Sequence, residues 1–137
     1  MEQLSVFLEN KSGRLTEVAK LLGNAGINLL AMTIADNSDF GTLRCIVSDT
    51  NLAEQVLKKA HFAVKRTHVV AFKCANVPGS LASVLAQMHE SGLFIEYMYS
   101  FARGEKSVIL LLPSDLEACT ALLETIPDIS IVSTDNF

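Results

Sequence analysis

The sequence repeats itself at a constant offset of 66 residues. The segment Asn-Lys-Ser-Gly-Arg-Leu at 10–15 returns as Asn-Val-Pro-Gly-Ser-Leu at 76–81, and in both places it lies between a short apolar run and a stretch of helical periodicity. Three further pairs match without a gap: Val18 with Val84, Leu22 with Met88, and Gly26 with Gly92. A repeat this regular predicts two copies of one structural module.

Each copy shows the order strand, helix, strand, strand, helix, strand. In the first copy, Ser12 is the expected N-cap of the first helix, Gly26 its left-handed C-terminal cap, and Asp49-Thr50 the cap of the second helix. The elements expected in the first copy are strands at 4–8, 27–35 and 42–47, a turn at 36–39, and helices at 15–25 and 52–60. The elements expected in the second are helices at 80–91 and 115–125 and strands at 93–101, 107–112 and 129–133, with a turn at 103–105.

This order of elements predicts a fold class. A βαββαβ chain forms a four-stranded antiparallel sheet with both helices on one face, the ferredoxin-like arrangement. The sequence therefore predicts an α+β protein with two tandem ferredoxin-like modules, one over residues 1–68 and one over residues 69–137. The apolar stretch at 64–74 contains the last strand of one module and the first of the next, which leaves no linker. We expect the modules to pack as a pseudo-twofold pair, and the exposed sheet edges to favour a homodimer.

Composition excludes several classes of partner. The chain has 137 residues and a net charge of −4, so neither nucleic acid nor an anionic membrane is an expected partner. Its three cysteines are far apart and lack the C-x-x-C spacing, which predicts neither a disulfide framework nor a metal site. No charged leader with an apolar core precedes the first strand, and no apolar run is long enough for a bilayer, so we expect a cytoplasmic protein.

No constellation of catalytic residues is present in the sequence. His61, His68 and His89 are separated, and the chain has no Walker A loop, no G-x-G-x-x-G and no G-x-S-x-G. The sequence therefore predicts neither an enzyme nor a bound cofactor. The loop after each first strand is the remaining candidate, because glycine allows a close backbone approach and a helix N-terminus favours a carboxylate. Turning the chain and capping the helix is the competing explanation of the same residues.

The two loops, together with the helix and strand after each loop, resemble the ACT domains. Members of this family are small βαββαβ modules with an Asn/Asp-x-Pro-Gly-x-Leu loop, a helix and then Gly-Val/Ile-Asn-Ile, and they bind amino acids and regulate metabolic enzymes. The second copy supplies Asn-Val-Pro-Gly-Ser-Leu at 76–81, and the first supplies its loop at 10–15 and Gly-Ile-Asn-Leu at 26–29. The resemblance covers essentially the whole chain, twice.

The resemblance implies roles for individual residues. Asn10 would bond the backbone groups of an amino acid, Asn28 would complete the polar clamp, and the amides around Ser12 to Leu15 would line the loop. In the first copy, Ser12 replaces the family's proline. In the second copy, Phe94 replaces the second asparagine and removes a polar anchor, so the first copy is expected to hold the better polar site. The predicted ligand-binding residues are Asn10, Lys11, Ser12, Gly13, Arg14, Leu15 and Asn28, together with Asn76, Val77, Pro78, Gly79, Ser80 and Leu81.

Three functions of different classes remain open. The first is an amino-acid sensor that acts on a client enzyme of amino-acid metabolism in trans, because the sequence shows no catalytic domain. The second is a dimerisation or interaction module whose loops no longer bind. The third is a small enzyme like acylphosphatase, with Arg14 in a phosphate loop, although Ser80 occupies the same place in the second copy. RNA binding would require paired exposed aromatic residues and a basic face, which the sequence does not show.

Overall fold

The computed structural model describes residues 1–9, 11–36 and 40–137. By internal contacts the chain forms two compact units, Glu2–Thr67 and His68–Phe137, and Met1 belongs to the second unit. We call them module 1 and module 2. Met1 joins module 2 because its amino group donates to the carbonyl of Val69 and its carbonyl accepts from the Val69 amide.

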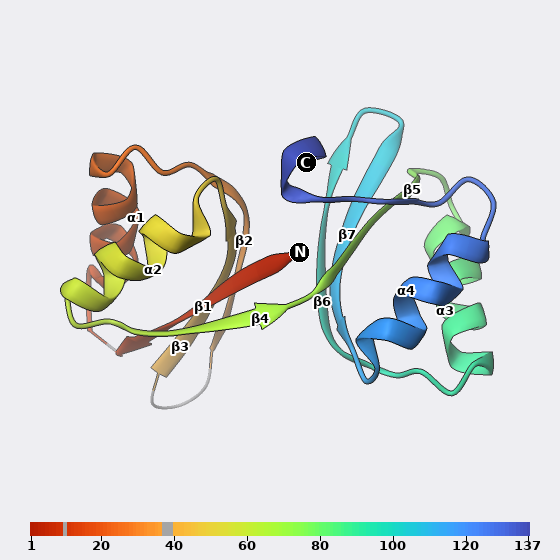
Figure 1. The fold of residues 1–137 in the computed structure, drawn as a ribbon, viewed down its shortest axis with the longest axis horizontal. Helices are drawn as coiled ribbons and strands as arrows, with labels where there is room; N and C mark the ends of the chain where they lie inside the picture. The colour runs from red at the N-terminus through yellow and green to blue at the C-terminus, as the bar shows by residue number, and fades with distance from the viewer. Residues whose placement is uncertain (10, 37–39) are drawn as a thin grey trace. The chain divides into compact units, whose positions relative to one another are not determined.

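Module 1 has the expected βαββαβ order. Its elements are β1 (Glu2–Glu9), α1 (Arg14–Asn24), β2 (Leu29–Asp36), β3 (Phe40–Val47), α2 (Thr50–Lys59) and β4 (Ala63–His68). The strands form one sheet in the order β2-β3-β1-β4, and both helices lie on one face of it (Figure 1). The core lies between helices and sheet, where Leu4 and Val6 of β1 meet Val18 and Leu22 of α1, all fully buried.

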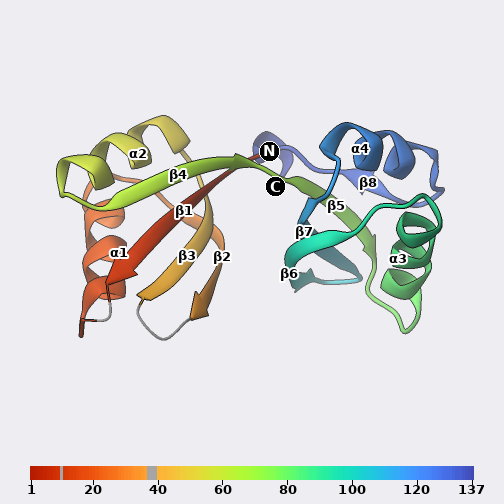
Figure 2. The same ribbon diagram turned by 90° about the horizontal axis from the view of Figure 1, so that it is seen from below.

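Module 2 repeats this architecture. Its elements are β5 (Val70–Ala75), α3 (Ser80–Glu90), β6 (Ile95–Arg103), β7 (Lys106–Pro113), α4 (Leu116–Thr125), β8 (Ser130–Ile131) and a final 3-10 helix, η1 (Thr134–Asn136). The sheet order is β6-β7-β5-β8, and α3 and α4 lie on one face (Figure 2). Val84 and Met88 of α3 are buried against Phe72 of β5, as the match of Met88 with Leu22 predicts. The two ferredoxin-like sheets of an α+β protein are confirmed.

Most of the predicted helix signals are correct. Asp49 caps α2 by accepting a hydrogen bond from the Leu52 amide, at 3.0 Å from N to Oδ1. Gly26 has a φ of +74° directly after the C-cap of α1, and the Ile27 amide reaches back to the Leu22 carbonyl, as in a Schellman motif. The predicted N-cap is wrong: Gly13, not Ser12, is the N-cap of α1 and provides no side-chain hydrogen bond.

The apolar stretch at 64–74 contains two strands, as expected: β4 and β5 are separated at Val69, whose amide bonds to Met1. One strand boundary differs from the expectation. The last strand is shorter than 129–133: only Ser130 and Ile131 pair with β5, although the Val132 amide still donates to Ala71. Part of the predicted turn at 36–39 lies outside the described residues.

Candidate functional site

The loop after the first strand has the same backbone path at its glycine in both modules. Gly13 has a φ of +84° and Gly79 a φ of +87°, and each precedes the first residue of a helix. The carbonyl of Gly13 accepts from the Glu17 amide at 2.9 Å, and that of Gly79 accepts from the Ser83 amide at 3.0 Å. Because L-residues rarely adopt this φ, the shared glycine is a backbone requirement of the turn. Asn10 lies outside the described residues.

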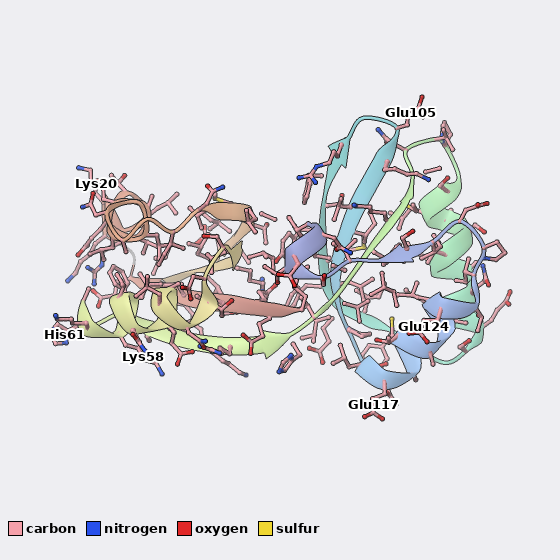
Figure 3. The ribbon with its side chains drawn as sticks, turned by 45° about the horizontal axis from the view of Figure 1, so that its top comes forward. Lys20, Lys58, His61, Glu105, Glu117 and Glu124 are labelled. Carbon is pink, nitrogen blue, oxygen red and sulfur yellow. The ribbon has the colours of Figure 1, made fainter. Side chains whose placement is uncertain are left out.

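A pocket of about 460 Å³ adjoins this loop in module 1. Four segments meet around it: the end of β1, the start of α1, the start of β3, and the turn from α2 to β4. Its described lining consists of Phe7, Leu8, Glu9, Arg14, Phe40, His61, Phe62 and Ala63. Figure 3 shows His61 at the end of module 1 where the chain leaves α2 to begin β4. A volume of this size and a mostly apolar lining with few polar groups are typical of small-molecule sites.

Two opposite charges lie side by side in the pocket. The Arg14 guanidinium contacts Glu17 through Nη1, at 2.8 Å, and Glu9 through Nη2, at 3.4 Å. Lys11 also contacts Glu9, at 3.0 Å. The hydrogen bond from Lys11, and then the charges of Lys11 and Arg14, lower the pKa of Glu9, while the hydrogen bond to Glu17 is the main cause of a raised Arg14 pKa. Both groups are therefore charged at neutral pH.

Arg14 is held in place by an aromatic ring. Its guanidinium carbon lies 4.7 Å from the centroid of the Phe62 ring, a cation–π distance. Phe62 is 5% exposed and belongs to the core of module 1, so its ring is a fixed platform. The Nε of Arg14 is buried and has no hydrogen-bond partner among the described residues. The arginine is thus oriented into the pocket wall rather than free in solvent.

Two further phenylalanines form an apolar wall. Leu4, Val6 and Leu8 of β1 point toward the helices, so Phe7 lies on the opposite face of the sheet, and Phe40 shares that face because it pairs with Glu9. The Phe7 and Phe40 rings meet edge to face with centroids 6.0 Å apart. Each is 39% exposed. This wall was not predicted from the sequence.

Asn28 lies at the other end of module 1. Its amide donates to Ser48 Oγ at 2.9 Å, and its carbonyl accepts from the Ser48 amide at 3.0 Å, just beyond the end of β3. The loop at 11–15 lies near Phe40, the first residue of β3, and eight strand residues span roughly 25 Å. The structure therefore does not bring Asn28 and Lys11–Leu15 together within the module. Phe94 makes the same backbone contacts with Ser114 in module 2.

In module 2 the loop asparagine has a structural partner. The Asn76 amide donates to the Glu105 carbonyl at 2.9 Å, and Ser107 Oγ donates to Asn76 Oδ1 at 3.2 Å. These bonds tie the loop at 76–81 to the β6–β7 hairpin. Val77 is 59% exposed, and Leu81 packs against the core of module 2. Pro78, Gly79 and Ser80 complete the turn into α3.

Module 2 has a smaller pocket at the corresponding place. It measures about 220 Å³ and lies at the end of β5, the start of α3 and the turn from α4 to β8. Each module has one residue other than glycine with a positive φ in this turn: Asp128, at +65°, in module 2 and His61, at +69°, in module 1. Ser80 and Ser83 line the pocket of module 2, at the positions that Arg14 and Glu17 occupy in module 1. The lining is Cys74, Ala75, Ser80, Ser83, Val84, Ile126, Pro127, Asp128 and Ile129.

Sequence reasoning identified Arg14 and its loop but missed the opposite wall of the pocket. The missed residues are Phe7, Leu8, Glu9, Phe40, His61, Phe62 and Ala63. One signal was available, since Phe7 is an aromatic residue at an outward position of a strand whose inward positions are Leu4, Val6 and Leu8. The contribution of the turn at 61–63 carries no local signal, because it depends on where α2 ends.

Other chemistry has little support in the part of the chain that is described. No group of three or more His, Cys, Asp or Glu side chains there is placed to hold a metal ion. Burial raises the pKa of Cys45 to about 12 and is the main cause of a rise to about 11 for Cys119, so neither thiol is a nucleophile at neutral pH. Within the same residues, no helix has the length and apolar character needed to cross a bilayer.

The fold and the loop geometry define a class, a tandem pair of ferredoxin-like modules with a glycine turn between the first strand and the first helix of each. The family of ACT domain pairs matches residues 1–133. The chain therefore belongs to this family, and the resemblance inferred from its two loops is confirmed.

Solved structures have the same fold. The crystal structure of protein BT0572 from Bacteroides thetaiotaomicron is 48% identical, with a TM-score of 0.94, over 98% of this chain and 93% of that one. The regulatory subunit of aspartate kinase from Thermus thermophilus, in a ligand-free form, is 12% identical with a TM-score of 0.66 over 88% of each chain. The corresponding subunit from Thermus flavus is 16% identical with a TM-score of 0.64, again over 88% of each chain. The two kinase subunits share the fold. The comparison with curated proteins found no match.

Proposed function

We propose that this tandem ACT-domain protein is a regulatory module that binds a free amino acid in the pocket of module 1 and acts on a client enzyme in trans. The observation that supports this most directly is the pair of opposite charges in the pocket, Glu9 and Arg14, 3.4 Å apart. A free α-amino acid has an ammonium group and a carboxylate on neighbouring atoms. It can bind both side chains at once, and the pocket remains neutral overall.

The polar end of the ligand meets the loop. Its carboxylate pairs with Arg14, helped by the unpaired amides at the start of α1, and its ammonium group pairs with Glu9. Asn10 and the backbone of Lys11–Leu15 close the loop over it. Asn28 would join such a site only from another copy of the chain, which is compatible with a homodimer. We place the protein in the cytoplasm, where free amino acids are available.

Binding would act by population shift. A ligand that orders the loop of module 1 favours the conformations in which that loop is closed, and a partner enzyme or the dimer responds to the change. The likeness to regulatory subunits of aspartate kinase supports the fold of such a module, whereas the client of this chain is a separate proposal.

The contacts of Arg14 weigh against the acylphosphatase-like alternative. Arg14 already contacts the carboxylates of Glu17 and Glu9, and a phosphate, unlike an amino acid, brings no positive charge that could pair with Glu9. An incoming phosphate would also meet those two negative charges. The ligand-free interaction module remains the second candidate, and the Asn76–Ser107 contact favours it for module 2, where the loop asparagine has a structural role.

Thermal denaturation against each proteinogenic amino acid at millimolar concentration tests the proposal. A ligand at 100 times its dissociation constant adds roughly 2.7 kcal/mol of stability and raises the melting temperature by several degrees. Glu9→Gln should abolish the shift, because it removes the partner of the ammonium group. Glu105→Gln, at the tip of the β6–β7 hairpin (Figure 3), is the matched control and should leave the shift intact. Silence with every amino acid would favour the interaction module.

A further inference from the structure

We infer that the pocket of module 1 selects an α-amino acid with a large apolar side chain, aromatic or long aliphatic, and that each chain binds one such ligand. This inference rests on the proposed function and adds the class of ligand and the stoichiometry. Three features of the described residues support it: the looseness of the Arg14–Glu9 contact, the phenylalanine wall, and the divergence of the pocket in module 2.

The polar half of the pocket has room for one zwitterion. Arg14 Nη1 holds Glu17 at 2.8 Å, a normal charge-assisted hydrogen bond, whereas Nη2 and Glu9 are 3.4 Å apart, beyond the usual range. A ligand carboxylate can therefore take Nη2 without displacing Glu17. The Glu9 carboxylate, whose side chain is 59% exposed, then receives the ammonium group. A ligand with only one of the two charges leaves one of these side chains without its new partner.

The rest of the pocket is apolar. Phe7 and Phe40 form one wall, and Phe62, which also supports the Arg14 guanidinium, forms another. A small or polar side chain would leave these rings in contact with water, whereas a phenyl or isobutyl group covers the exposed parts of Phe7 and Phe40. An aromatic ligand can also meet them in the edge-to-face geometry that the two rings already adopt. Large apolar side chains are therefore favoured.

Module 2 lacks each of these features at the corresponding place. Its pocket has about half the volume, and serines occupy the positions of Arg14 and Glu17. Lys73 occupies the position of Phe7 at the same offset, and its ammonium group donates to the Asn136 carbonyl. The repeat thus keeps the backbone of the site and loses both its charge pair and its aromatic wall. We expect no amino acid in this second pocket.

Isothermal titration of the whole chain tests the inference. We expect L-phenylalanine and L-leucine to bind at least tenfold more tightly than L-alanine, L-serine or glycine, with one ligand per chain. 3-Phenylpropionate, which lacks the ammonium group, and phenethylamine, which lacks the carboxylate, should each bind at least tenfold more weakly than L-phenylalanine. This analogue series uses the unchanged protein and so does not depend on any variant folding.

Variants locate the site. Phe40→Ala should weaken L-phenylalanine binding at least tenfold, and Phe40→Leu should restore part of the loss because it keeps an apolar wall. Phe94→Ala, at a 66% exposed phenylalanine of module 2, is the matched control and should bind normally. Tighter binding of serine or alanine, two ligands per chain, or an unchanged affinity in Phe40→Ala would overturn the inference and leave the proposed function intact. No binding by any amino acid would overturn both.

Discussion

Replacing Gly13 by alanine should destabilise the protein by about 1 kcal/mol, through the backbone alone. The φ of +84° at Gly13 is in the region that L-residues avoid, so an added Cβ costs energy there even in open space. The space is indeed open, because no heavy atom would lie within 4 Å of that Cβ. Overlap with neighbouring atoms therefore contributes nothing to the expected loss, and relaxation of neighbours cannot relieve it.

The chain offers a duplicate and a control for this experiment. Gly79→Ala should cost a similar amount, since its φ is +87° and its Cβ would also meet nothing. Gly23→Ala, in the last turn of α1, has no positive φ and equally open space, so it should stabilise the protein by roughly 0.5–1 kcal/mol. Urea denaturation followed by far-UV circular dichroism measures all three, with unchanged m-values. Neutral Gly13→Ala and Gly79→Ala variants would refute the left-handed turn before each helix.

Burial and charge give three further expected outcomes. Leu22→Ala removes a fully buried side chain of module 1 and should cost about 3–4 kcal/mol in urea denaturation, and a loss below about 1 kcal/mol would mean that the core is not packed as described. Cys45 and Cys119 should resist alkylation by iodoacetamide at pH 8 in the native protein and react only after denaturation, as mass spectrometry can follow. The contacts of Glu9 lower its pKa below the usual 4.5. Their contribution to the free energy of unfolding is therefore fully present above pH 4.5 and is lost as the pH falls through the lowered pKa. In Glu9→Gln, the free energy of unfolding should fall less steeply on the acid side of its pH profile.

The fold could be predicted from the sequence because its signals are local and occur twice. The glycine after α1, the aspartate before α2 and the apolar stripe of each helix all act within a few residues, and the second copy supports each interpretation of the first. The N-cap of α1 was placed one residue too early, at Ser12 instead of Gly13. The length of β8 was overestimated because it depends on pairing with β5, which lies far away along the chain.

The candidate site was only half predictable, for a similar reason. Arg14 belongs to a loop with a sequence signature, but its neighbours come from elements far along the chain. Phe40 reaches the pocket through its register with Glu9, and Phe62 through the end of α2. For Asn28 the structure adds a condition: α1 carries the chain to the far end of the sheet before Asn28 is reached, so the polar clamp that the resemblance implies would need another copy of the chain.

Comparison of the two modules separates what the fold needs from what a ligand needs. Residues that determine the backbone path are alike in both copies. Glycines with positive φ lie before and after the first helix, and an aspartate caps the second helix. In each copy a serine hydroxyl also accepts a hydrogen bond from the backbone amide of the residue before the second strand. Residues that line the pocket differ, with Arg14 against Ser80 and Phe7 against Lys73. Module 2 reaches the same fold with serine and lysine at the positions of Arg14 and Phe7, so the fold as such does not require those two side chains. Phe62 is different, because it belongs to the core of module 1. The proposed binding of an amino acid would account for Arg14 and Phe7, for which the fold gives no reason.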